Sequence, residues 1–445
     1  MSVPAGIDAE RGPPMAVPLG HFLVGFAFLL AGSALGVASA AGLDPGLAGL
    51  AHVHLLLVGW VCLTIMGAMT QFVPVWSGVD LHSRRLAVLH LVLVAVGVAA
   101  FAGLLVAGEL RWLPFAGGVM LAGFWTFAYN VGRSLARSDG LDATERHFAL
   151  ALGFLLVVTT LGVLLAFALG GRPLPLGLVH TRVVAAHVTL AVFGVVLTTV
   201  VGALYQLATM FTQTELDRLD LTLQRVEGSS YPVGVAALAG GRLFGNAAAA
   251  SVGAVLTLTG LLAVAVVLAR TLHETRVERT PMLSRYAVVA VALPAWAMAT
   301  APRWLARPAT PVDVLGPPGA SHLLLAGVVG FVLLGTLYHV VPFILWVRRY
   351  ADRVGLEPVP MIDDLYDDRV AAADFWLTLT GTALVVGSPG PPRVVVLGGV
   401  LATLGVGLFA ANLFGVVVRH GPESLRVDRF AVDDGESRPV DEKGP

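Results

Sequence analysis

The sequence predicts an all-α fold, a polytopic membrane bundle of twelve transmembrane helices in three pseudo-equivalent four-helix repeats. Composition decides the class, because the 445 residues are 56% hydrophobic and only 13% charged, with a mean hydropathy of +0.82. A soluble chain is usually about a quarter charged. Apolar runs of about 20 residues, the length that crosses a bilayer core, recur along almost the whole chain. Soluble enzymes are therefore excluded.

The apolar runs predict where each helix lies. The predicted helices cover residues 20–42, 50–76, 86–108, 113–133, 148–170, 180–211, 230–245, 247–269, 285–302, 318–347, 372–388 and 393–418. They form one membrane domain with repeats at residues 20–135, 147–270 and 284–418.

The segments outside these helices are polar. Residues 212–229 carry leucines among charges and predict a short interfacial helix. Residues 351–370 predict a cytoplasmic loop. Residues 1–19 and 421–445 predict cytoplasmic tails, and the second of these is expected to be disordered.

The distribution of basic residues predicts the orientation. Most arginines, including Arg84 and Arg348, fall on the side that both termini share, and the positive-inside rule makes that side cytoplasmic. Asp8 and Glu10 precede a full-length first span, so no cleavable signal peptide is expected. The prediction is a multi-pass protein of the cell (plasma) membrane.

Charge and cysteine content exclude further classes. The net charge is −1 and the basic residues are scattered, so nothing predicts nucleic-acid binding. The one cysteine, Cys62, excludes an intramolecular disulfide and a thiolate metal site. The partner that composition itself predicts is the lipid bilayer.

Three segments of the chain are similar to one another. They begin at Ala51, Ala185 and Ala320. One register superposes Gly59 with Gly194 and Gly327, and Gly67 with Gly202 and Gly335. Small residues at this spacing are typical of close helix packing in lipid. With four helices in each repeat, the second, sixth and tenth helices are predicted to be equivalent and parallel.

Four histidines of these helices are the candidate ligands. In the same register His52 aligns with His187, and His54 aligns with His322. All four imidazoles are then expected in the first turns of helices that enter from outside, at nearly one depth. An interhelical hydrogen bond explains a single such histidine. Polar groups in hydrocarbon cost free energy and mark function, so we expect at least two of the four to bind haem iron or copper.

Helix geometry separates His52 from His54. Two residues apart, their side chains point about 200° apart and lie about 3 Å apart along the axis. They cannot both bind one small metal ion in an intact helix, whereas haems on opposite flanks would each accept one imidazole. One helix can therefore serve two sites.

This arrangement of helices and histidines resembles subunit I of the haem-copper oxidases. The segment HVHLLLVGW, which begins at His52, is similar to the H-x-H motif that C-type oxidases carry on the tenth helix, and the NnrS family of the nitric oxide response has a comparable stretch. The resemblance implies one b-type haem between the second and tenth helices, bound by His54 or His52 together with His322. It also implies a cytochrome c, a cupredoxin subunit or a quinol as partner.

The sequence departs from the oxidases at the copper site. The oxidases use one histidine of the sixth helix and an adjacent pair on the seventh. His187 matches the first, but residues 231–245 contain no histidine. A three-histidine copper site is therefore not evident. The opposed directions of His52 and His54 indicate instead a second haem or metal site between the second and sixth helices, with His187.

Charged residues give two further expectations. Arginines near the outer face are candidates for binding haem propionates, because a guanidinium pairs well with a carboxylate. These are Arg182, Arg303, Arg307 and Arg393. The spans themselves are expected to lack carboxylates, because Glu109 and Asp374 lie near predicted ends.

The leading hypothesis is an oxidase-like membrane haem protein for electron transfer or for the chemistry of a diatomic gas, O2 or NO. If the chain is an enzyme, the resemblance implies a cytochrome c oxidase- or nitric oxide reductase-like oxidoreductase. The alternative is a metal or small-molecule transporter, or a metallochaperone, that uses the histidines as transient ligands. The number of haems and the electron donor stay open.

Overall fold

The computed structural model describes residues 13–387 and 392–421, which form helices joined by loops, with no strand among them. Ten of the described helices are long and apolar enough to cross a membrane. The all-helical class is thus confirmed for the described residues, and these helices are compatible with a lipid bilayer. The predicted tails fall mostly on residues 1–12 and 422–445, which lie outside the described residues.

The long helices follow one another along the chain with short connections. They are α1 (Ala16–Ala40), α2 (Ala48–His54) leading to α3 (Leu63–Ser77), α4 (Arg84–Ala107), α5 (Leu113–Leu135), α6 (Ala143–Leu169), α7 (His180–Thr189) leading to α8 (Thr198–Thr212), α9 (Arg218–Phe244), α10 (Ala247–Glu274), α11 (Pro281–Ala306), α12 (Ala320–His322) leading to α13 (Phe331–Arg349), α14 (Asp368–Gly387) and α15 (Pro392–His420). Of these, α5 and α9 are not among the ten apolar helices.

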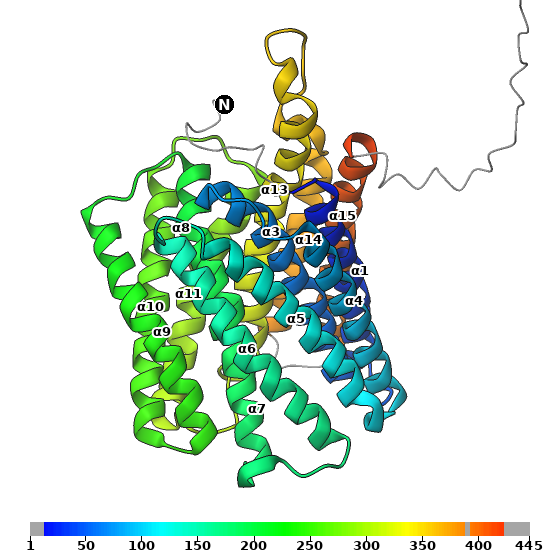
Figure 1. Ribbon diagram of the computed structural model, residues 1–445, viewed down its shortest axis with the longest axis vertical. Coiled ribbons are helices and arrows are strands. Elements are labelled where there is room, and N and C mark those ends of the chain that lie inside the picture. Colours follow the sequence, from blue (N-terminus) through cyan, green and yellow to red (C-terminus); the bar gives the residue numbers. More distant parts are fainter. Residues whose placement is uncertain (1–12, 388–391, 422–445) are drawn as a thin grey trace, which may run out of the picture.

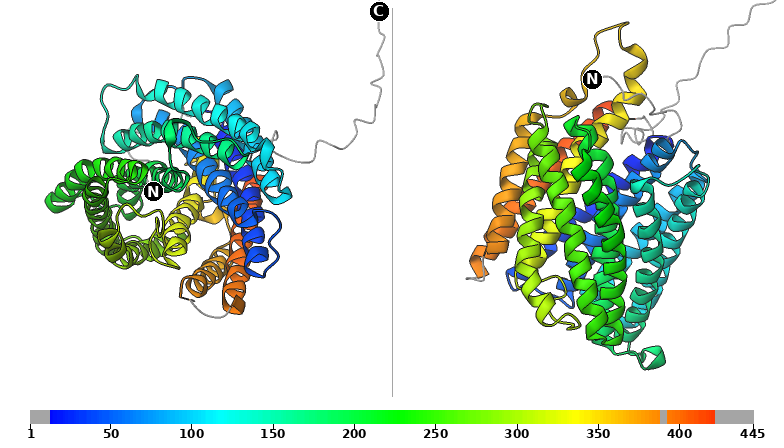
Figure 2. Two further views of the ribbon diagram at one scale, coloured as in Figure 1. Left: turned by 90° about the horizontal axis from the view of Figure 1, so that it is seen from below. Right: turned by 90° about the vertical axis from the view of Figure 1, so that its left-hand side faces the viewer.

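The helices run roughly along one axis, with the connections at its two ends (Figure 1). α1 packs against α15 as well as against the helix of residues 48–77, so the first and last helices are neighbours. Viewed end-on, α9 and α10 in green form one arc, and α14 and α15 in orange and red lie across the bundle (Figure 2). We call the end where α2, α7 and α12 begin the histidine end.

The helices that carry the candidate histidines form the centre of the bundle. The helix of residues 320–349 is 83% buried over its most apolar stretch and that of residues 180–212 is 78% buried, whereas α1 and α15 are each 28% buried. α3, α8 and α13 also share an apolar cavity of about 70 Å³. Among its lining residues are Thr64, Thr199 and Val332, which superpose in the register of the repeat.

Each of these three helices contains a π-helical segment. The segments are Leu55–Cys62, Leu190–Leu197 and Leu323–Gly330. Each begins four residues before a first glycine of the register, so the backbone irregularity returns at the interval of the sequence repeat. π-helical turns are rare and occur frequently at functional sites. Here they directly follow His54 and His322 and begin three residues after His187.

The start of α9 differs from the prediction. Residues 212–229 were expected to link two spans through a separate interfacial helix, but α9 runs unbroken from Arg218. Asp217 accepts hydrogen bonds from the N–H groups of Leu219 and Asp220, and Asp220 completes the capping box. These N–H groups, with Arg270 nearby, lower the pKa of Asp217, so the cap is ionised at neutral pH.

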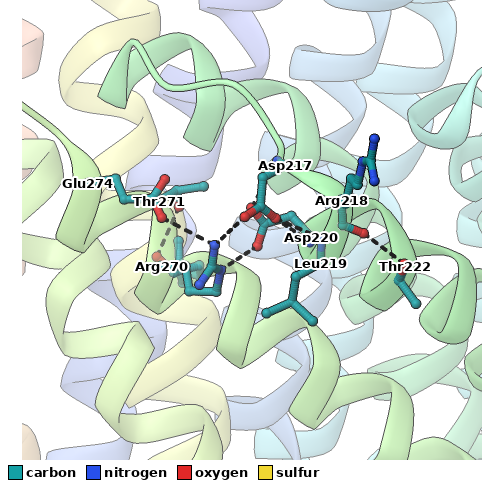
Figure 3. A network of polar contacts seen from close by, with 9 residues as sticks. Asp217, Arg218, Leu219, Asp220, Thr222, Arg270, Thr271 and Glu274 are labelled. Atoms are coloured by element: carbon teal, nitrogen blue, oxygen red, sulfur yellow. Dashed lines mark hydrogen bonds and ion pairs between the residues drawn. The ribbon is translucent and has the colours of Figure 1, made fainter.

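An ion network holds this capped turn against α10 (Figure 3). The guanidinium of Arg270 lies 2.7 Å from Asp217 and 2.8 Å from Asp220, and it also contacts Glu274. Asp220 is 1% exposed, so Arg270 offsets the cost of burying its carboxylate. A polar segment can therefore continue a helix of the bundle, which composition alone does not indicate.

Candidate functional site

His52 and His187 are anchored in the same way. Nδ1 of His52 donates a hydrogen bond to the carbonyl oxygen of Gly32 on α1 at 2.7 Å, and Nδ1 of His187 donates to that of Val158 on α6 at 3.1 Å. Each imidazole is thus bonded to the helix that precedes its own in the chain. The alignment of these two histidines in sequence therefore corresponds to one structural role.

A glycine makes room for each of these two rings. Gly36 and Gly162 each lie four residues beyond the carbonyl that the imidazole bonds. A Cβ at Gly36 would lie 2.5 Å from Cε1 of His52, and one at Gly162 would lie 3.0 Å from Cε1 of His187. Any larger residue would push the ring away from its carbonyl.

His54 is anchored on its own helix. Its Nδ1 donates to the carbonyl oxygen of Leu50 at 2.9 Å, and the ring lies 4.9 Å from that of Phe101 on α4. With Nδ1 carrying the proton, the neutral imidazoles of His52, His54 and His187 each keep a lone pair on Nε2. Metal-binding histidines usually donate their other ring N–H to a carbonyl or carboxylate in this way.

Electrostatic interactions link the four imidazoles two by two. His322 lies within electrostatic reach of His52, and His187 lies within electrostatic reach of His54. The opposed directions predicted for His52 and His54 thus lead to different partners. His52, His54 and His187 are half-buried, and His322 is exposed in the protein alone.

None of the four arginines predicted for propionates is buried. Arg303 forms an ion pair with Asp313 at 2.6 Å. Arg182 lies against Gly245, where an added Cβ would meet its guanidinium at 2.5 Å. Arg307 and Arg393 have exposed side chains. The described residues thus leave these arginines at the surface of the histidine end.

The described residues contain no group of three or more His, Cys, Asp or Glu side chains that could hold a metal ion. Tyr231 on α9 bonds the π-helical segment of residues 190–197 instead. The hydroxyl of Tyr231 donates to the carbonyl oxygen of Phe193, in the π-helical segment, at 2.6 Å. Thr198 donates to the same oxygen at 2.9 Å.

Asp374, expected near the end of a span, is a buried carboxylate close to the start of α14. Its carboxylate, in the second turn of α14, is 0% exposed and pairs with Arg285 of α11. The hydroxyl of Tyr338 donates to the same carboxylate, and the Arg285 guanidinium stacks on the Tyr338 ring at 4.7 Å. Tyr338 is therefore a buried partner of this ion pair.

A matching cluster joins α6, α8 and α9. Nε2 of His147 on α6 is 2.9 Å from Glu227 of α9, and the hydroxyl of Tyr205 donates to the other oxygen of Glu227 at 3.1 Å. Glu227 is 0% exposed. Sequence analysis missed this carboxylate because it placed Glu227 in the segment 212–229 outside the spans.

A neutral counterpart joins α1 and α4. Nε2 of His21 on α1 lies 3.3 Å from Nδ1 of His90 on α4, and both rings are fully buried. The three clusters are equivalent because the second glycine of the register packs against the first-helix member each time. A Cβ at Gly67, Gly202 or Gly335 would lie 2.7, 2.5 or 3.2 Å from the Cβ of His21, His147 or Arg285. Tyr205 and Tyr338 align in the register of the sequence repeat, and both donate to a buried carboxylate. This alignment was the signal in the sequence for two of the clusters.

Comparison of the chain with protein-family models and with curated proteins finds no match. The resemblance to the oxidases therefore rests on the quoted segment and on the arrangement of histidines.

The pairing of the histidines predicts a cross-linking pattern. In a Cys62→Ser background, double variants His52→Cys/His322→Cys and His54→Cys/His187→Cys should be joined by shorter bifunctional thiol reagents than the crossed pairs 52/187 and 54/322. The readout is the mobility shift in denaturing gels. Crossed pairs that join with equal or shorter reagents would contradict the pairing.

The buried ion pair predicts a large effect on stability. Asp374→Asn removes the charge that balances Arg285 and should lower the free energy of unfolding by about 3–5 kcal/mol. Glu357→Gln is the control, because its pair with Arg353 is exposed on both sides, and it should change stability by less than about 0.5 kcal/mol. Unfolding by detergent titration measures both, and equal effects would refute the assigned role of Asp374.

Proposed function

We propose that the chain is an oxidase-like membrane haem protein that holds a b-type haem between His52 and His322. The anchoring of His52, His54 and His187 is the observation that carries the proposal, because it fixes the proton on Nδ1 and leaves the Nε2 lone pair free to bind a metal. His322 lies near His52 and supplies the opposite ligand. A haem with two histidine ligands transfers electrons.

His54 and His187 form a second site in this proposal. They lie near one another, and each has its Nδ1 bonded to a carbonyl. Such a pair suits a second haem or a copper ion, since imidazole is a good ligand for both metals. A gas ligand, O2 or NO, would bind where a haem keeps one open position.

The proposal includes the twelve-span architecture in three four-helix repeats. Three features support it: the matched π-helical segments, the matched anchoring of His52 and His187, and the three equivalent polar clusters of α1, α6 and α11. In this architecture both termini are cytoplasmic, in the plasma membrane, and the histidine end faces outward. A cytochrome c, a cupredoxin or a quinol would then donate electrons near that end.

Purification from a haem-replete host tests the proposal. The protein should show a Soret band and, after reduction by dithionite, sharp α bands. His52→Ala and His322→Ala should each abolish the low-spin signal, whereas His54→Ala should retain it. His82→Ala is the control, because His82 lies at the opposite end of the bundle and bonds Arg137.

Two outcomes would contradict this function. Wild-type protein without a Soret band would refute haem binding. Stoichiometric copper or zinc without porphyrin, lost on substitution of the same histidines, would instead favour the transporter or metallochaperone alternative, in which the free Nε2 lone pairs bind a metal in transit.

A further inference from the structure

Arg242 of α9 is a buried cation of the histidine end. Its side chain is 1% exposed, and none of its contacts among the described residues is with a carboxylate. The guanidinium stacks at 4.9 Å over the ring of Trp304 on α11. Burying an arginine without a counter-charge costs free energy. We therefore expect its hydrogen bonds to hold particular segments of the chain in place.

The contacts of Arg242 join two segments that carry ligands. Nη1 donates to the hydroxyl of Thr189, two residues after His187 on α7, at 2.7 Å. The same nitrogen lies 3.4 Å from the carbonyl oxygen of Val314, and Nε donates to that of Pro308 at 3.2 Å. Both carbonyls belong to the loop of residues 307–319, which leads directly into α12 and His322.

The loop of residues 307–319 has little freedom once it is bonded. The indole N–H of Trp296 donates to the carbonyl oxygen of Leu315 at 2.9 Å. Gly316 has φ of 107°, and a Cβ there would lie 2.4 Å from the hydroxyl of Thr300. Gly319 has φ of 84°, and a Cβ added there would lie 2.7 Å from the carbonyl oxygen of Val386. The position of this loop therefore sets where α12 begins.

We propose that Arg242 is a positioning residue of the histidine site, which fixes the helix of His187 and the loop before His322 relative to one another. The inference rests on the proposed haem function. Arg242 acts through Thr189, Pro308 and Val314, because a planar guanidinium reaches several acceptors in fixed directions. An error of about 1 Å in a supporting contact is enough to weaken a metal site.

The test compares purified holoproteins. Arg242→Met keeps much of the length of the side chain and removes its hydrogen-bond donors. Arg242→Lys keeps the charge but lacks the planar guanidinium with its several donors. We expect Arg242→Met to convert at least half of the low-spin haem signal to high spin, and to speed haem transfer to apomyoglobin by ~10-fold or more. Arg242→Lys should recover part of both. Arg172→Met, an exposed arginine that stacks on Phe167, is the control and should match wild type.

A wild-type spin state in the variant, or the absence of haem from the wild-type protein, overturns the proposal. If Arg242→Met lowers yield or stability but the purified protein has wild-type spin state and haem transfer, Arg242 is only structural. If Arg242→Met does not fold, Thr189→Val removes the α7 contact alone and should shift the spin state in the same direction, and an unchanged spectrum refutes the role. If wild-type protein carries no haem, the proposed function fails and the role of Arg242 fails with it.

Discussion

The hydrogen bonds from Nδ1 of His52 and His187 to the preceding helices are the interactions on which the site depends. In hydrocarbon an imidazole must satisfy its N–H within the protein, and a backbone carbonyl does so without adding charge. The bond also leaves Nε2 free and fixes the direction in which its lone pair points. The glycines at Gly36 and Gly162 follow from this constraint, because each makes room for one ring.

The cost of placing polar groups in hydrocarbon also explains why polar side chains are paired at the opposite end of the bundle. The three equivalent clusters differ in charge: His21 with His90, His147 with Glu227, and Arg285 with Asp374. Each joins two helices through buried polar groups, α1 with α4, α6 with α9 and α11 with α14, and among the described residues Nε2 of His90 alone in these pairs is left without a hydrogen-bond partner. Similar backbones therefore accommodate pairs that differ in charge.

Much of the fold could be read from sequence, because apolar runs and a repeated glycine register are local signals. The alignment of His52 with His187 also carried over to one structural role. The sequence left open whether His52 or His54 lies nearer to His322, since helix geometry gives the direction of a side chain but not the neighbour that it meets. Glu227 was missed for a related reason: its helix starts in a polar segment whose charges are balanced only by distant residues, Arg270 and His147.

The central claim is that His52 and His322 share one ligand at the histidine end. An electron cryo-microscopy map of the protein purified from a haem-replete host tests it most directly. The account predicts planar density between the two imidazoles, with Nε2 of each ring directed at its centre. Continuous lipid density at that position, or imidazoles that contact each other with nothing between them, would contradict it.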